Sequence, residues 1–146
     1  MKRNARGFTL VEILIVVIIL GILAAIVIPQ FTSASSDARN NSTASTLQTL
    51  RSQIELFKIQ HADVPPKDAT ALWTVLGGKT STTDTTAVNA AGTFGPYVQN
   101  PPANPLNGFT TVAAASGTAA GWVYTVGTNG YYVSATDTTG TGISTY

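Results

Sequence analysis

The 146-residue sequence contains no cysteine, a single histidine and few charged residues, which make up 10% of the chain. Without cysteine, neither a disulfide framework nor a thiolate nucleophile or metal site can form. Catalysis requires titratable groups that converge on one point, whereas the seven carboxylates here are scattered along the chain. The composition therefore predicts a protein that is not an enzyme.

Basic side chains are also scarce once the first residues are set aside. Lys2, Arg3 and Arg6 all precede residue 7, so eight basic residues less these three leave five, against seven acidic ones. Nucleic-acid binding depends on clustered Lys and Arg that displace condensed counterions. No nucleic-acid partner is evident from this distribution.

One long apolar segment lies near the N-terminus. Residues 13–28 carry no polar side chain, and the run back to Phe8 is interrupted only by Thr9 and Glu12. As a helix, the run from Phe8 is about 31 Å long, which is enough to cross the hydrocarbon core of a bilayer. The basic residues immediately before it favour a cytoplasmic N-terminus, with the rest of the chain outside the cytoplasm.

Glu12 is the unusual residue in this segment, which could otherwise be a plain single-pass anchor or a secretory signal peptide cut near Ala34 or Ser36. The apolar run exceeds the roughly 7–15 residues of a signal peptide's apolar region. An ionised carboxylate in hydrocarbon is costly unless it is paired, and no Lys, Arg or His occurs between Phe8 and Thr32. The partner of Glu12 must therefore come from another chain, or from a backbone amine created by cleavage.

The residues Gly7-Phe8-Thr9-Leu10-Val11-Glu12, after a short basic leader and before an apolar helix, resemble the processing motif of type IV prepilins and type II secretion pseudopilins. The resemblance implies cleavage between Gly7 and Phe8 by a membrane-embedded peptidase, which also methylates the new N-terminus at Phe8. Glu12 then becomes the fifth residue, and its carboxylate attracts the Phe8 ammonium of a neighbouring subunit. In a low dielectric that pairing is strong and sets the axial register of a filament.

Gly21 and Pro29 extend the resemblance, at positions where related subunits carry a helix-breaking pair that bounds a segment able to melt on assembly. Pro29 also removes the amide that would bond to the carbonyl of Ala25. A proline that simply ends the membrane helix is the alternative. We expect a kinked or loosened helix instead, because a helical pattern resumes beyond it.

The resumed pattern indicates an amphipathic helix that ends before Val64-Pro65-Pro66. Its apolar face has spacings of three, four and three residues, and its members are Leu47, Leu50, Ile54 and Phe57. We expect His61 to be solvated at its C-terminal end, where it interacts with the helix dipole. A short helix is predicted over residues 68–76, with Trp73 buried.

The C-terminal third is rich in strand-forming residues. Residues 122–126 and 131–135 flank a turn that contains Asn129-Gly130, and residues 109–113 form a plausible third strand. The predicted fold class is α+β, with a long N-terminal helix packed on a small antiparallel sheet.

A second resemblance lies before the strands. Gly95-Pro96-Tyr97-Val98 and Asn104-Pro105-Leu106-Asn107-Gly108 resemble segments of the major pseudopilin of type II secretion. The resemblance implies calcium, which major pseudopilins commonly bind in the C-terminal loop through acidic side chains. Beyond residue 84, however, only Asp137 is acidic, whereas calcium takes 6–8 oxygen ligands. We therefore expect no metal or other cofactor, with weak calcium binding as the alternative.

The predicted organisation has four parts: a cleaved leader (1–7), a transmembrane and assembly helix (8–29), its amphipathic continuation (30–62) and a C-terminal globular part (63–146). The resemblance implies a structural subunit processed by prepilin peptidase/methyltransferase. It also implies polymerisation with other copies of itself and with minor pilins or pseudopilins, by an inner-membrane assembly platform and its ATPase.

We expect a major-pseudopilin-like component of type II secretion, held first in the inner membrane and then in an envelope-spanning or surface filament. A type IV pilin used for adhesion, motility or DNA uptake is the first alternative, and a membrane-anchored binding module that never polymerises is the second. The absence of cysteine favours the pseudopilin, because type IVa pilins usually close their C-terminal loop with a disulfide. The poor calcium ligand set counts against it.

Overall fold

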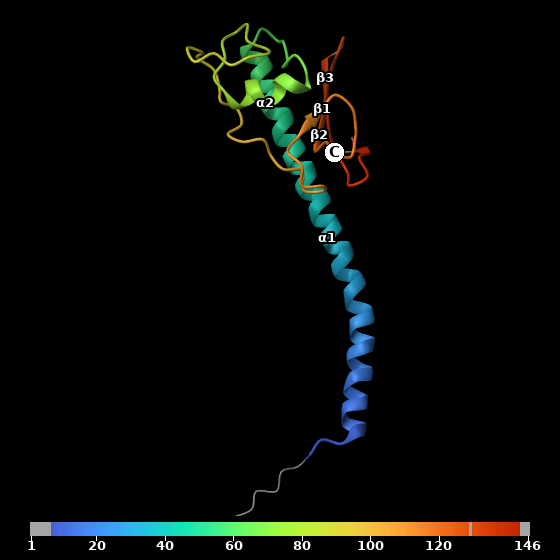
Figure 1. Ribbon diagram of the computed structural model, residues 1–146. Helices are drawn as coiled ribbons and strands as arrows, with labels where there is room; N and C mark the ends of the chain where they lie inside the picture. The colour runs from blue at the N-terminus through green and yellow to red at the C-terminus, as the bar shows by residue number, and fades with distance from the viewer. Residues whose placement is uncertain (1–6, 129, 144–146) are drawn as a thin grey trace, which may run out of the picture. The chain divides into compact units, whose positions relative to one another are not determined.

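The computed structural model describes residues 7–128 and 130–143, and the chain divides into two compact units, Met1–Ala38 and Arg39–Tyr146. Helix α1 (Leu10–Gln60) contributes to both units and continues through Pro29 (Figure 1). The helix that was predicted to resume beyond Pro29 is therefore confirmed. It ends at Gln60, and the chain then takes positive φ angles at Ala62 and Asp63, which no α-helix accommodates.

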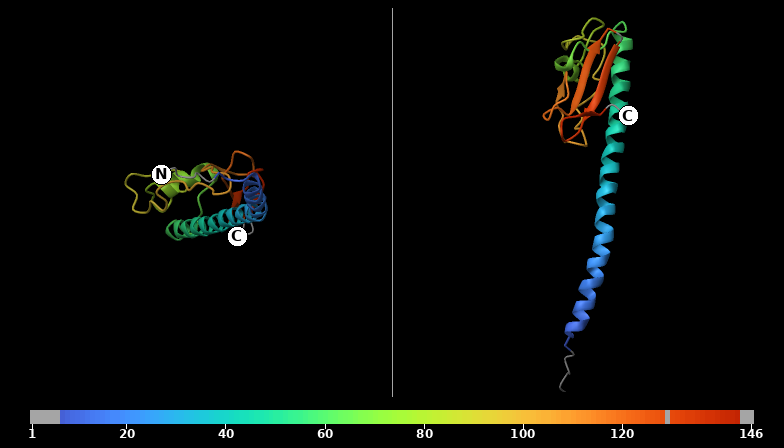
Figure 2. Two further views of the ribbon diagram at one scale, coloured as in Figure 1. Left: turned by 90° about the horizontal axis from the view of Figure 1, so that it is seen from below. Right: turned by 90° about the vertical axis from the view of Figure 1, so that its right-hand side faces the viewer.

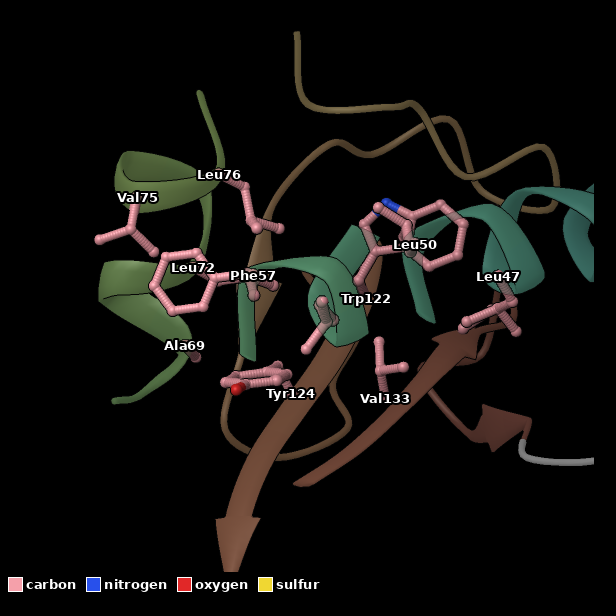
Figure 3. Packing of buried hydrophobic residues seen from close by; sticks show 12 residues of the cluster. Leu47, Leu50, Phe57, Ala69, Leu72, Val75, Leu76, Trp122, Tyr124 and Val133 are labelled. Atoms are coloured by element: carbon pink, nitrogen blue, oxygen red, sulfur yellow. The ribbon is translucent and has the colours of Figure 1, made fainter. Parts of the chain in front are cut away.

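The core of the second unit forms where α1 meets helix α2 (Ala69–Gly77) and the sheet. The predicted apolar face of α1 is confirmed, since its four members are between 0% and 2% exposed. Figure 3 shows side chains from both helices and two strands converging on one cluster. Its remaining members are Ala69, Leu72, Val75, Leu76, Trp122, Tyr124, Val133 and Ala135.

The sheet has the order β1-β2-β3-β4, and its strands are β1 (Val112–Ala113), β2 (Trp122–Gly127), β3 (Gly130–Thr136) and β4 (Gly142–Ile143). The long strands β2 and β3 lie side by side next to α1 in the right-hand view of Figure 2. Gly127 pairs with Gly130, as the predicted hairpin requires, although Asn129 of its turn lies outside the described residues.

The expectation of a purely antiparallel sheet is wrong, because β1 pairs with β2 in parallel. The connection between them carries the chain back to the end at which β1 began. The amides of Gly121 and Trp122 both donate to the carbonyl of Thr111, which fixes that return. A parallel pair needs a crossover rather than a tight turn, and with only two residues in β1 an eight-residue loop suffices.

Asp68 positions helix α2. It is the N-cap residue, and its carboxylate accepts from the Ala71 amide at 2.9 Å and from the Thr70 hydroxyl at 2.6 Å. The expectation that Trp73 is buried is only partly met, because its side chain is half-buried. Its Nε1 donates to the Thr110 carbonyl at 2.9 Å. That bond connects α2 to the residues before β1.

His61 is not solvated, contrary to expectation: its side chain is 1% exposed. Its ring stacks on Phe57 one turn earlier, with centroids 3.7 Å apart and planes within 6°. Nδ1 lies 2.7 Å from the Phe57 carbonyl, which makes Nδ1 the protonated nitrogen. Phe94 and Tyr97 meet the same ring edge-on, so an aromatic cluster encloses the end of α1. Helix periodicity cannot reveal such enclosure by a segment more than thirty residues away.

Tyr97 anchors the Gly-Pro-Tyr segment to both helices. Its hydroxyl donates to Gln60 Oε1 at 2.6 Å, and its amide and that of Val98 donate to the Leu76 carbonyl at the end of α2. Gly95 has a φ of 78°, and a Cβ there would collide with the Gly78 carbonyl oxygen. Glycine is therefore required at the turn that delivers Tyr97 to this position.

The core can be tested by the same substitution at two sites on α1. Leu50→Ala should lower the free energy of unfolding by about 2–5 kcal/mol, because Leu50 is 2% exposed and its loss leaves a cavity. Leu56→Ala, at a position 42% exposed, should cost about 0.5 kcal/mol or less. Chemical denaturation of the full chain in detergent micelles measures both, and equal losses would contradict this core.

The cap of α2 should make stability depend on pH. The Thr70 hydroxyl, and then the Ala71 amide, lower the pKa of Asp68 below its usual value. The folded state therefore favours the ionised form, and this stabilisation is present above about pH 4 and lost as the pH falls through the lowered pKa. Asp68→Asn keeps a capping oxygen but not the charge. We expect the gap between the two denaturation midpoints to shrink from neutral pH to about pH 3, and a gap that is equal at both pH values would show that the charge contributes nothing.

Candidate processing and assembly site

The N-terminal end of α1 is closed by two side chains that bond reciprocally. Glu12 Oε2 accepts from the Thr9 amide at 2.8 Å and from the Thr9 hydroxyl at 2.7 Å, and the Glu12 amide lies 3.2 Å from Thr9 Oγ1. This is a capping box, which satisfies two of the amides that a helix start leaves unbonded. Sequence reasoning missed the role of Thr9, although Thr-x-x-Glu before an apolar run is its signature.

The capping box leaves the charge of Glu12 unneutralised. Both bonds from Thr9 go to one oxygen, and the structure shows no hydrogen bond to Oε1 from any residue that it describes. Neither of the two described ion pairs involves this carboxylate. Thr9 therefore satisfies part of the hydrogen-bonding capacity of Glu12, while Oε1 and the negative charge of the ionised carboxylate remain available to a cation.

Gly7 and Phe8 precede the helix and are both exposed, Phe8 by 85%. A Cβ on Gly7 would meet no atom within 4 Å, and the same is true of Gly21 inside α1. Glycine costs a helix interior about 1 kcal/mol relative to alanine. Since neither glycine is required by the subunit's own packing, any requirement for them comes from outside the subunit. Residues 1–6 of the predicted leader lie outside the described residues.

The first half of α1 exposes apolar side chains around its whole circumference. The large apolar residues from Leu10 to Ile28 are between 42% and 81% exposed. By length and composition this part of α1 can cross a membrane. A helix that is apolar all round requires an apolar environment, either lipid or other helices.

Pro29 lies inside α1, where it cannot donate to the Ala25 carbonyl. One turn later, the hydroxyls of Thr32 and Ser33 donate to the carbonyls of Ile28 and Pro29 at 3.2 Å each. Hydroxyl bonds of this kind compete with backbone amides for the same carbonyls. The helix is continuous through Pro29, and the predicted kink or loosening there stays a prediction.

Within the described part of the chain, no three His, Cys, Asp or Glu side chains are grouped so that they could hold a metal ion. The predicted processing residues Gly7 and Phe8 lie next to the capping box of Thr9 and Glu12. Gly21 and Pro29 lie further along the same helix and do not contact them.

Comparison with known proteins gives a match to the prokaryotic N-terminal methylation motif over residues 2–28. The chain is 37% identical over 65 residues to a type II secretion system core protein G of Dickeya chrysanthemi, and 36% identical over 64 residues to one of Pseudomonas aeruginosa. It is 35% identical over 65 residues to the type IV narrow pilus major component PilA5 of Thermus thermophilus.

Each of these matches covers 44% of this chain, and they cover 42%, 45% and 56% of the three relatives. The chain thus spans about half the length of the curated relatives it matches. No solved structure matches the chain.

The capping box predicts a specific effect of Thr9→Val, which keeps the shape of the side chain and removes its hydroxyl. The amides of the first turn of α1 should exchange hydrogen severalfold faster, because one donor to Glu12 and the acceptor for its amide are both lost. Amide exchange by NMR in micelles measures this. Thr9→Ser keeps the hydroxyl and should behave like the natural chain; exchange as fast in Thr9→Ser as in Thr9→Val would show that the hydroxyl does not protect these amides.

Proposed function

We propose that this chain, which carries the N-terminal methylation motif and resembles type IV pilins and type II secretion pseudopilins, is a structural filament subunit. The proposed filament is the pseudopilus of a type II secretion system, in which the chain serves as a major-pseudopilin-like component. The observation that carries the proposal is the unneutralised carboxylate of Glu12 at the start of an exposed, apolar helix.

Cleavage between Gly7 and Phe8 supplies the cation that Glu12 requires. The new ammonium at Phe8 lies directly before Thr9, which already bonds to Oε2 of its own Glu12. Oε1 remains for the ammonium of a neighbouring subunit. A charge-assisted bond of this kind in a low dielectric is strong and directional, so it both draws the incoming subunit into place and sets its register.

The apolar circumference of α1 supports the same function. In a waiting subunit the segment from Leu10 to Ile28 is covered by lipid, with the N-terminus in the cytoplasm and the C-terminal unit outside it. In the filament, helices of other copies replace the lipid. Gly21, where no internal contact requires glycine, allows a neighbouring helix to approach closely.

The proposed partners follow from these steps. They are prepilin peptidase/methyltransferase, other copies of this chain, minor pilins or pseudopilins, and the inner-membrane assembly platform with its ATPase. No step in this scheme calls for catalysis by the subunit.

A surface pilus is the second candidate, because one relative is named a type IV narrow pilus major component. Two observations favour the pseudopilus: the Gly-Pro-Tyr segment is built into the fold through Tyr97, and the chain contains no cysteine for a loop disulfide. Electron microscopy at native expression separates the two candidates. Filaments confined to the envelope support the pseudopilus, and extended surface filaments support the pilus.

Processing and assembly can be tested with Glu12→Gln. Glutamine still serves in a capping box, so the variant removes the charge while keeping the helix start. We expect the amount of recovered filament to fall at least about tenfold, because a charge-assisted hydrogen bond is roughly twice as strong as a neutral one. Filament recovered by shearing and sedimentation is the measurement.

Glu55→Gln, at an exposed glutamate that pairs with Lys58, is the matched control and should assemble normally. Intact mass and N-terminal sequencing of the natural chain should show a methylated Phe8. A chain that begins at Met1 or near Ser35, or a Glu12→Gln variant that assembles fully, would contradict the proposal.

A further inference from the structure

The resemblance to major pseudopilins implies calcium in the C-terminal loop, and the chemistry of that loop can be tested for its fit to the ion. Asp137 is the only acidic residue beyond residue 84. Its Oδ1 already accepts from the Thr139 amide at 2.8 Å, the Thr139 hydroxyl at 2.7 Å and the Thr141 amide at 2.8 Å. The Thr139 hydroxyl, followed by the Thr141 amide, lowers the pKa of this carboxyl. Asp137 thus closes its own turn.

Asn104 connects three separate segments instead. It is fully buried, and its Nδ2 donates at 2.7 Å to the Gly121 carbonyl before β2 and at 2.7 Å to the Thr136 carbonyl at the end of β3. Its Oδ1 accepts from the Leu106 amide at 2.9 Å. Both donor hydrogens and the acceptor of this amide are therefore used.

Asn107 makes a second connection from the segment before β1, to which Asn104 also belongs. Its Nδ2 lies 2.9 Å from the Ala120 carbonyl, 3.0 Å from Thr136 Oγ1, 3.3 Å from the Thr136 carbonyl and 3.4 Å from the Asp137 carbonyl. Its Oδ1 accepts from the Phe109 amide at 3.0 Å, and the Thr136 hydroxyl itself donates to the Ala120 carbonyl. Four oxygen atoms thus converge on one amide nitrogen.

These oxygens are the kind of ligand that calcium uses, but an N–H group already points at them. A cation placed among the carbonyls of Ala120, Gly121 and Thr136 would have to displace the Asn104 and Asn107 amides. In exchange it would gain at most one free carboxylate oxygen, Oδ2 of Asp137, because Oδ1 is engaged in its turn. A site with one carboxylate and so few free oxygens is a poor fit for an ion that takes 6–8 oxygen ligands.

We infer that the side-chain amides of Asn104 and Asn107 close the C-terminal loop in place of a calcium ion, so that folding of this subunit does not depend on divalent cations. The two amides join the residues directly before β2 to the residues at the end of β3. These two places are neighbours in space but lie over a dozen residues apart in the sequence. Each amide acts as a fixed, uncharged cross-link that is independent of the composition of the medium.

The first test is thermal unfolding of the full chain in detergent micelles, with EGTA and then with millimolar calcium. We expect midpoints that agree within about 1 °C, because an ion bound only by the folded state would raise the midpoint by several degrees once its concentration far exceeds Kd. A rise of several degrees with calcium would overturn the inference. Unfolding of the subunit needs neither cleavage nor assembly, so this result is distinct from failure of the proposed filament function.

The second test removes the amides singly. Asn104→Asp is isosteric but places a carboxylate oxygen against two carbonyls, and it should lower the midpoint by about 10 °C or prevent folding. Asn107→Ala removes the more exposed amide and should lower the midpoint by a smaller, measurable amount. Asn100→Asp, at an exposed asparagine of the same loop, is the matched control and should leave the midpoint unchanged. If the unfolding midpoint of Asn107→Ala or Asn104→Asp is no lower than that of Asn100→Asp, the amides do not close the loop.

Discussion

The first part of the chain is organised by the cost of a carboxylate in an apolar environment. Glu12 is the only ionisable residue from Phe8 to Thr32, and its charge can be neither hydrated in lipid nor paired within this segment. The Thr9 cap satisfies one oxygen and thereby makes the residue tolerable without neutralising it. In the proposed filament, this carboxylate is partly satisfied in the isolated subunit and fully satisfied only by the amine of another subunit, which gives assembly its direction.

The glycines of the first unit fit the same constraint. Gly7 and Gly21 border open space, and inside a helix glycine is unfavourable, so the subunit alone gains nothing from them. In the second unit the opposite holds at Gly95 and Gly121, where a Cβ would collide with a backbone carbonyl of the same unit. The two units thus differ at their glycines: those of the second unit are required by its own fold, whereas those of the first are not, and under the proposed function they serve contacts with other molecules.

Much of the fold could be read from local patterns. The spacing of Leu47, Leu50, Ile54 and Phe57 identified the buried face of α1, and alternation with a turn signal located the β2–β3 hairpin. The errors concern contacts between distant segments. Helix periodicity placed His61 in solvent because two of the rings that cover it, Phe94 and Tyr97, come from a segment more than thirty residues away. Strand propensity alone could not show that β1 runs parallel to β2.

The candidate site shows a related division. The Gly7–Phe8 bond, Glu12, Gly21 and Pro29 were predicted from a short contiguous motif and its spacing, whereas the capping role of Thr9 was missed although Thr-x-x-Glu is its local signature. The loop amides lay within a recognised segment, yet nothing in Asn-Pro-Leu-Asn-Gly indicates that its two side chains span the sheet from the start of β2 to the end of β3. A buried amide is favourable only if every donor and acceptor is satisfied, and Asn104 meets that condition through residues 17 and 32 positions away. A chain without cysteine can therefore hold a loop by side-chain amides, whose partners are fixed by the register of the sheet rather than by any local sequence signal.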